Sequence, residues 1–217
     1  MITTVLDIIS DKQLFHSEDS EDRYLTNSVT WEQYEALLSE LEDAPGFRLT
    51  YLDGVLEIVS PSRRHETGKT RIGTLLEIFF EETNTEYFPL GSTTFRAQTQ
   101  RGGTEPDESY CIGTEKEFPD LAIEVIVTSG GINRLQVYNR LNVKEVWFWQ
   151  DSCFTLYHLR EETPADFLET YGYEPVSHSE LLPSLDVALL TESMQHPTSL
   201  LAAKEFRKRL QETVKGA

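Results

Sequence analysis

The stretch EPDESYCI, residues 105–112, and the stretch PDLAIEVIV, residues 119–127, decide the fold that this sequence predicts. Each reads as a short strand bounded by residues that form turns. Period-two alternation places Asp107 and Ser109 on one face of the first strand, while Glu124 lies within an apolar run on the second. An unpaired buried carboxylate costs several kcal/mol, so both carboxylates need a cation, hydrogen-bond donors or a wet cleft.

The flanking sequence predicts helices and further strands around this pair. Thr30 and Gln33 have the spacing of a capping box before an amphipathic helix. Residues 47–59 alternate around an Asp-Gly pair and predict a hairpin, and residues 65–82 carry an apolar helical face. Other strands are expected over residues 87–90, 93–98, 145–149 and 154–159, with glycine pairs as separators, and a helix over residues 132–141.

The order of these elements indicates the fold class. The helix over residues 132–141 connects two strands, and such a crossover normally makes a right-handed parallel unit. The other strands follow one another closely enough to pair antiparallel. The sequence therefore predicts an α/β or α+β fold with a mixed sheet flanked by helices.

The composition limits both location and partners. The 217 residues carry 19 Lys and Arg against 37 Asp and Glu, a formal net charge of -18, which argues against broad attachment to nucleic acid or anionic lipid. No cleavable signal is recognisable, and no apolar run approaches the roughly 20 residues that span a bilayer. The two cysteines fit a reduced compartment. We expect a cytoplasmic protein without membrane contact.

The chain is predicted to have three parts. Residues 1–28 include the acidic stretch HSEDSED and are expected to form an N-terminal arm, residues 29–182 the main domain, and residues 183–217 a helical extension. An amphipathic helix over residues 199–214 carries the basic cluster Lys204, Arg207, Lys208 and Arg209. This cluster is either a solvated face or a nucleic-acid contact, and the solvated face is the more common case.

Two interpretations of the strand-borne carboxylates remain open on spacing alone. Asp107 and Glu124 from neighbouring strands would suit a hard divalent ion such as Mg²⁺, which prefers oxygen ligands. Alternatively, Asp107 serves the turn after Pro106 and Glu124 pairs with a buried arginine or lysine.

A set of short motifs resembles the Uma-type family within the restriction-endonuclease-like superfamily. Pro106-Asp107 followed by Glu124 resembles the PD-(D/E)-x-K pattern of that superfamily. The further motifs occur in the order that the family shows, and the resemblance spans about residues 29–159: LDGVLEIVSP (52–61), His65-Glu66, GSTTF (91–95), EPDE (105–108), PDLAIE (119–124), TSGG (128–131) and VKEVW (143–147).

This resemblance implies a restriction-endonuclease-like core with Asp107 and Glu124 as the ligands of Mg²⁺ or Mn²⁺. The motif lysine is missing, because Ile126 occupies its position. Many family members instead carry a lysine on the following helix, four residues before a tyrosine, and here Arg134 stands four residues before Tyr138. An arginine can stabilise an anionic transition state, but it cannot deprotonate water at neutral pH.

Glu57 and His65 are further candidates for the catalytic site. Glu57 could add a metal or water contact, and His65 could contact a phosphate. The alternative is that His65 caps the helix and Glu57 pairs with Arg63 or Arg64, and this alternative is slightly favoured because isolated His and Glu residues rarely mark sites.

The sequence thus predicts a Mg²⁺-dependent endonuclease that acts on DNA, with a homodimer expected because enzymes of this fold often pair. The alternative is a catalytically inactive or accessory protein of the same fold that binds a partner. The acidic charge and the missing lysine both favour this alternative.

Overall fold

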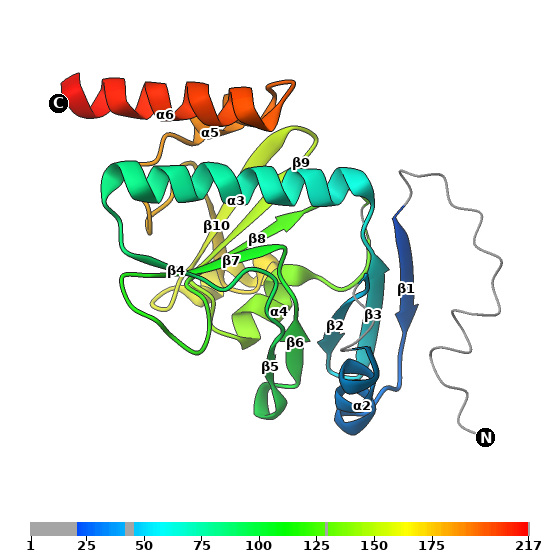
Figure 1. Cartoon of the computed structure of the whole chain (residues 1–217). Helices are drawn as coiled ribbons and strands as arrows, with labels where there is room; N and C mark the ends of the chain where they lie inside the picture. The colour runs from blue at the N-terminus through cyan, green and yellow to red at the C-terminus, as the bar shows by residue number, and fades with distance from the viewer. Residues whose placement is uncertain (1–20, 42–45, 129, 217) are drawn as a thin grey trace.

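The computed structural model describes residues 21–41, 46–128 and 130–216, which form two sheets and the helices that cover them (Figure 1). The first sheet has the strand order β1-β3-β2-β6-β5 and is antiparallel throughout. Its strands are β1 (Asp22–Thr26), β2 (Arg48–Leu52), β3 (Val55–Ser60), β5 (Phe95–Ala97) and β6 (Gly102–Thr104).

The predicted hairpin is confirmed at the centre of this sheet. Asp53 and Gly54 join β2 to β3 with φ angles of 48° and 92°, and positive φ at both central residues is typical of a type I′ turn. The capping box is also confirmed, because Thr30 N donates to Gln33 Oε1 over 2.8 Å and Gln33 N to Thr30 Oγ1 over 3.2 Å. It precedes α2 (Trp31–Leu41), which packs on β2 and β3 through Tyr34.

Two strands of the first sheet differ from the sequence-based expectations. β1 lies in the segment that was expected to be an arm, and it pairs along its full length with β3; residues 1–20 of that segment lie outside the described residues. β6 contains Gly102 and Gly103, which were expected to separate strands. A Cβ at Gly103 would press on the ring of Tyr34, so this glycine allows close packing of helix on sheet rather than a turn.

The second sheet is the predicted mixed sheet, with the order β11-β10-β9-β8-β7-β4. Its strands are β4 (Tyr87–Pro89), β7 (Glu108–Ile112), β8 (Leu121–Val125), β9 (Glu145–Gln150), β10 (Cys153–Leu159) and β11 (Tyr173–Val176). β8 and β9 run parallel and are connected through α4 (Arg134–Arg140), as expected for a crossover, and the other pairs are antiparallel.

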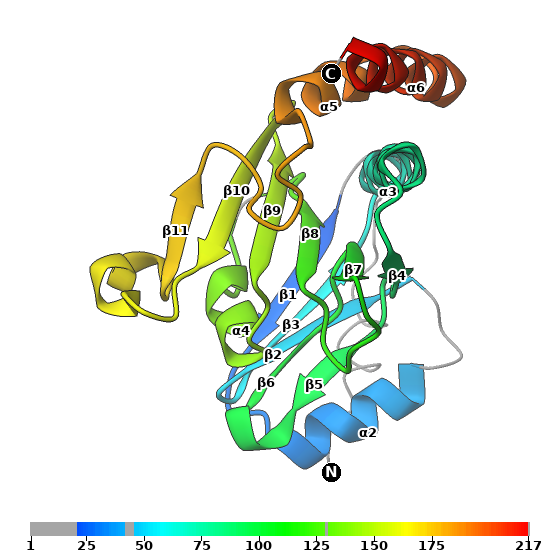
Figure 2. The ribbon, with the colours of Figure 1, turned by 90° about the vertical axis from the view of Figure 1, so that its left-hand side faces the viewer.

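Helices cover both faces of the mixed sheet, as Figure 2 shows. α3 (Arg63–Thr83), α5 (Val187–Met194) and α6 (Ser199–Gly216) pack on one face in a core that includes Leu121, Ile123 and Val125 of β8. α4 packs on the opposite face, against Ala122. Short 3₁₀ helices, η1 (Gln98–Gln100) and η2 (Pro164–Thr170), complete the described elements. No helix in the described ranges is long and apolar enough to cross a membrane.

The basic cluster of α6 is partly used inside the molecule. Arg207 pairs with Glu81 and Glu82 of α3, and Arg209 lies 3.7 Å from Glu192 of α5. These contacts attach the C-terminal helix to the acidic end of α3. They favour the interpretation of the cluster as a solvated, intramolecularly paired face.

Candidate acidic site between the two sheets

Asp107 and Glu124 face each other across adjacent strands. Glu108 pairs with Ile123, so the next step of this antiparallel register places Asp107 opposite Glu124. The Asp107 amide donates to the Ile123 carbonyl oxygen over 3.1 Å, and the Val125 amide donates to Asp107 Oδ2 over 2.6 Å. Both carboxylates are almost fully buried, and both line a pocket of about 320 Å³ between the two sheets. The structure therefore brings this pair together on one face of the mixed sheet.

Arg48 and His65 both contact the Asp107 carboxylate. His65 Nε2 lies 2.7 Å from Asp107 Oδ1, and its Nδ1 lies 2.8 Å from Glu21 Oε1, so both ring nitrogens have carboxylate partners. Arg48 from β2 forms an ion pair with the same Asp107 oxygen. The prediction that His65 caps the helix is wrong, because Ser62 is the N-cap and accepts from the His65 amide over 3.2 Å. The imidazole belongs to the acidic site instead.

Glu124 is held by two residues of α4. The Tyr138 hydroxyl donates to Glu124 Oε1 over 2.5 Å, and Arg134 Nε lies 3.5 Å from the same oxygen. Burial and the charge of Glu124 raise the pKa of Tyr138 well above its ordinary value, so the phenol stays protonated and donates. The expected alternative, a Glu124 paired with a buried cation, is thus realised by Arg134.

Glu57 of β3 is completely buried and joins three parts of the site. Arg134 Nη2 lies 2.7 Å from its Oε1, Arg23 Nη1 of β1 lies 3.1 Å from the same oxygen, and the Ile132 amide donates to Oε2 over 2.7 Å. The expected pairing with Arg63 or Arg64 is wrong. Both arginines are exposed on the first turn of α3, whereas Glu57 points into the space between the sheets.

Gly131 makes the Ile132 hydrogen bond possible. Its φ angle is 93°, and a Cβ at this position would overlap Oε2 of Glu57 and crowd the Arg23 guanidinium. A residue with a side chain therefore fits neither the backbone conformation nor the space. The glycine of the TSGG motif thus serves the burial of Glu57.

Arg134 is the cation at the centre of the site. It is the first residue of α4, follows the N-cap Asn133, and also hydrogen-bonds Thr50 of β2. Burial alone would lower its pKa, but the charges of Glu124 and Glu57 outweigh that effect and raise the pKa. The guanidinium remains charged and connects the mixed sheet to the antiparallel sheet.

Several residues of the site were not predicted from the sequence. Glu21 and Arg23 lie in the segment expected to be an arm, yet Thr128 Oγ1 donates to Glu21 Oε2 over 2.5 Å and Arg23 Nη2 donates to the Thr128 carbonyl oxygen over 3.1 Å. Arg48 reads in the sequence as an ordinary polar residue at the start of a hairpin. The sequence did offer one signal for Arg48, because it is a charged residue between the apolar residues Phe47 and Leu49 of the predicted hairpin.

The donor set fits a divalent cation held by few protein ligands. In the described part of the chain, no group of three or more His, Cys, Asp or Glu side chains is arranged to hold a metal ion. Asp107 and Glu124 are nevertheless hard oxygen donors on one pocket wall, and none of the described residues hydrogen-bonds Oε2 of Glu124. Mg²⁺ commonly takes one or two carboxylates and completes its shell with water, so this pair matches its chemistry.

A mixed sheet with a crossover helix and a pair of carboxylates on adjacent strands defines a protein with a restriction-endonuclease-like fold. Residues 31–191, well over half of the chain, match the model of the Uma2 family, which is described as "Putative restriction endonuclease". The chain belongs to this family. The match extends past residue 182, where the main domain was expected to end. A comparison with curated proteins finds no match.

Proposed function

We propose that this protein is a divalent-metal-dependent endonuclease that cleaves DNA. The observation that carries the proposal is the placement of Asp107 and Glu124 opposite each other in one pocket, beside the buried cation Arg134. Membership of a family described as restriction endonucleases supports the same reaction class. The proposal includes a cytoplasmic location and a homodimer.

Asp107 and Glu124 would hold the cation, which is Mg²⁺ or Mn²⁺ by this proposal. When bound, such an ion lowers the pKa of a water molecule and neutralises charge on the phosphate. Arg134 adds a fixed positive charge beside Glu124, where it stabilises the negative charge that develops on the scissile phosphate. Its pKa is too high for it to accept a proton from water.

Glu57 and His65 act as positioning residues in this scheme. Both oxygens of Glu57 accept hydrogen bonds, Oε1 from Arg134 and Arg23 and Oε2 from the Ile132 amide, so Glu57 fixes the Arg134 guanidinium. His65 is held between Glu21 and Asp107 through both ring nitrogens. It therefore orients the Asp107 carboxylate rather than contacting a phosphate.

DNA cleavage in the presence of Mg²⁺ or Mn²⁺ tests the proposal. We expect Asp107→Asn and Glu124→Gln each to lower turnover by about 100-fold or more, because each removes a charged ligand at the reacting centre. Asp53→Asn is the matched control, since Asp53 lies at the exposed hairpin turn and should leave turnover unchanged. Absence of hydrolysis by the unaltered protein with either metal would overturn the proposal.

The second candidate is a partner-binding protein of the same fold without catalysis. The observation that favours it is that both carboxylates already have partners within the chain, since Asp107 contacts Arg48 and His65, and Glu124 contacts Arg134. Calorimetric titration with Mn²⁺ separates the two candidates, because only the endonuclease requires the ion to bind. Binding that is lost in Glu124→Gln supports the endonuclease.

The homodimer is proposed because a single chain offers few cations to DNA, and pairing two copies doubles that footprint. Light scattering coupled to size-exclusion chromatography gives the mass in solution. A mass of one chain at the concentrations used for cleavage would contradict this part of the proposal.

A further inference from the structure

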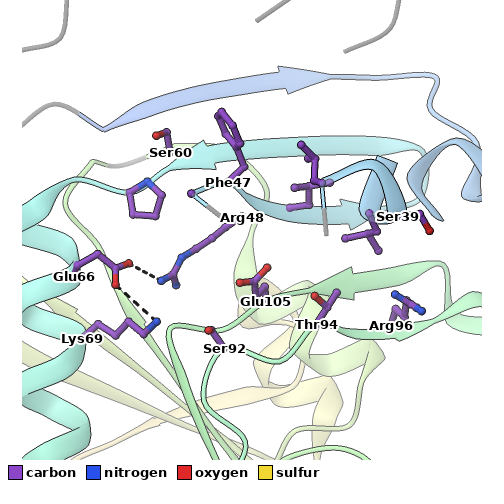
Figure 3. A pocket seen from close by; sticks show the side chains of 15 residues that line it. Ser39, Phe47, Arg48, Ser60, Glu66, Lys69, Ser92, Thr94, Arg96 and Glu105 are labelled. Carbon is purple, nitrogen blue, oxygen red and sulfur yellow. Dashed lines mark hydrogen bonds and ion pairs between the residues drawn. The ribbon is translucent and has the colours of Figure 1, made fainter. Parts of the chain in front are cut away.

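A second, larger pocket lies beside the acidic site. Its volume is about 800 Å³, and it shares Arg48 and Glu105 with the pocket that holds Asp107 and Glu124. Figure 3 shows Arg48 reaching into it and pairing with Glu66, which in turn faces Lys69. We call this pocket the flanking groove. Because the two pockets share lining residues, an extended ligand bound in the flanking groove could also reach the acidic site.

Hydrogen-bond donors follow one another along one wall of the flanking groove. Ser92, Thr94 and Arg96 all line it, and in Figure 3 they follow one another along the segment before β5 and on β5 itself. They alternate in sequence with Thr93 and with Phe95, which is buried in the core on the α4 side of the mixed sheet. Ser92 lies in the turn before β5, and Arg96 lies on β5 itself. A row of donors along one wall suits an extended ligand.

Three cations line the groove of this acidic protein. Arg48, Lys69 and Arg96 lie there beside the carboxylates Glu66 and Glu105, while the whole chain carries a formal charge of -18. Arg48 is engaged by Asp107 and by Glu66, and Arg96 lies 3.2 Å from Glu35. The lining by itself is therefore less acidic than the chain as a whole, which favours a strand of phosphates here over other parts of the surface.

We propose that the flanking groove binds the single DNA strand on one side of the scissile phosphate, with Lys69 and Arg96 contacting its phosphates and Ser92 and Thr94 donating hydrogen bonds to them. This inference rests on the proposed endonuclease function and assigns its substrate form. A volume in the range of pockets that hold small ligands suits a few unpaired nucleotides better than a duplex. The partly exposed apolar residues of the lining, Leu38, Phe47 and Pro61, offer contact to sugars and bases.

Fluorescence anisotropy in the presence of EDTA tests strand binding without cleavage. The probes are a short labelled single strand of DNA and the blunt duplex of the same sequence, both at low salt. We expect the single strand to bind at least about fivefold more tightly than the duplex, because stacking and strand-backbone contacts require unpaired nucleotides. Lys69→Ala and Arg96→Gln should each weaken single-strand binding by about fivefold, because each removes one phosphate contact at low salt.

Lys208→Ala is the control for these variants, since Lys208 is exposed on α6 and does not line the groove. Thermal unfolding confirms that each variant is folded. Equal affinity for duplex and single strand, or unchanged binding in both groove variants, would overturn the inference. If strand binding depends on Lys69 and Arg96 but the protein does not cleave DNA with Mg²⁺ or Mn²⁺, the inference about the groove holds and the proposed endonuclease function is wrong.

Discussion

Arg134 stabilises the fold in addition to its proposed role in turnover. It is the shared partner of Glu57 and Glu124, two carboxylates that have almost no contact with water. Removing one member of a buried ion pair leaves an uncompensated charge, and that loss exceeds the net contribution of the intact pair.

We therefore expect Arg134→Ala to lower the free energy of unfolding by about 3 kcal/mol or more. Arg134→Lys keeps the charge but cannot reach Glu57, Glu124 and Thr50 together, so its loss should be smaller. Urea denaturation measures both. Arg140→Ala on the same helix is the control, because the Arg140–Asp53 pair is at the surface and contributes below about 1 kcal/mol. Equal losses for Arg134→Ala and Arg140→Ala would contradict the buried-pair interpretation.

The two free cysteines differ in environment and should differ in reactivity. Cys111 is buried on β7, and burial raises the pKa of its thiol, whereas Cys153 is exposed at the start of β10. Since the thiolate is the reactive form, iodoacetamide should label Cys153 alone in the native protein and both residues after denaturation. Peptide mass spectrometry identifies the labelled sites. Rapid native labelling of Cys153→Ser would show that Cys111 is accessible.

The sequence predicted the location of three candidate site residues better than it predicted their partners. Asp107, Glu124 and Arg134 were placed by strand alternation and by resemblance, and the structure brings all three to one pocket. The ion pairs of Glu57 were missed, because Arg23 lies on a neighbouring strand and Arg134 comes from the crossover. Periodicity reports which face a residue occupies and carries no information about partners distant in the chain.

Strand β9 is connected to the segment before the C-terminal helices by the buried carboxylate of Glu145. Glu145 is fully buried and accepts hydrogen bonds from Trp147 Nε1, Ser179 Oγ and the backbone amides of Glu180 and Leu181, at 2.9, 2.7, 2.6 and 3.0 Å. His158 Nδ1 lies 3.1 Å away. The segment that leads into α5 and α6 is thereby fixed to the mixed sheet.

Glu145→Gln should lower the free energy of unfolding by about 2–3 kcal/mol, because the amide nitrogen cannot accept from the donors that surround it. We also expect faster proteolysis within residues 177–186, followed by mass spectrometry of the fragments. Glu161→Gln is the matched control, since Glu161 is exposed beside Lys144. Unchanged proteolysis in Glu145→Gln would show that the segment is held by its apolar contacts alone.

Elements with a local signal were predicted correctly. The hairpin, the capping box and the parallel crossover each depend on a few neighbouring residues. β1 and β6 were missed because pairing with β3 and β2, and the packing of Gly103 under Tyr34, decide their conformation. Both strands belong to the antiparallel sheet, so the presence of a separate antiparallel sheet was not anticipated either.

For the whole molecule, the acidic surface limits how DNA can bind. The described cations lining the two pockets are Arg23, Arg48, Lys69, Arg96 and Arg134. Each phosphate contacted on a single strand contributes about 0.7 to the slope of log affinity against log salt. We expect a slope shallower than about -3.5 per chain, measured by anisotropy over a salt series. A much steeper slope would mean that DNA contacts basic residues elsewhere, and Lys208→Ala would then reduce it.

The close approach of Gly131 to Glu57 constrains how this family can diverge. A side chain at position 131 would occupy the same volume as the carboxylate of Glu57. A relative with a larger residue at position 131 must therefore carry a shorter residue at position 57. Intermediates that carry both would misplace the Ile132 amide and the Arg23 guanidinium. Across related sequences, a residue other than glycine at position 131 should therefore occur only where position 57 is no longer glutamate, although α3 and half of the mixed sheet lie between the two positions in the chain.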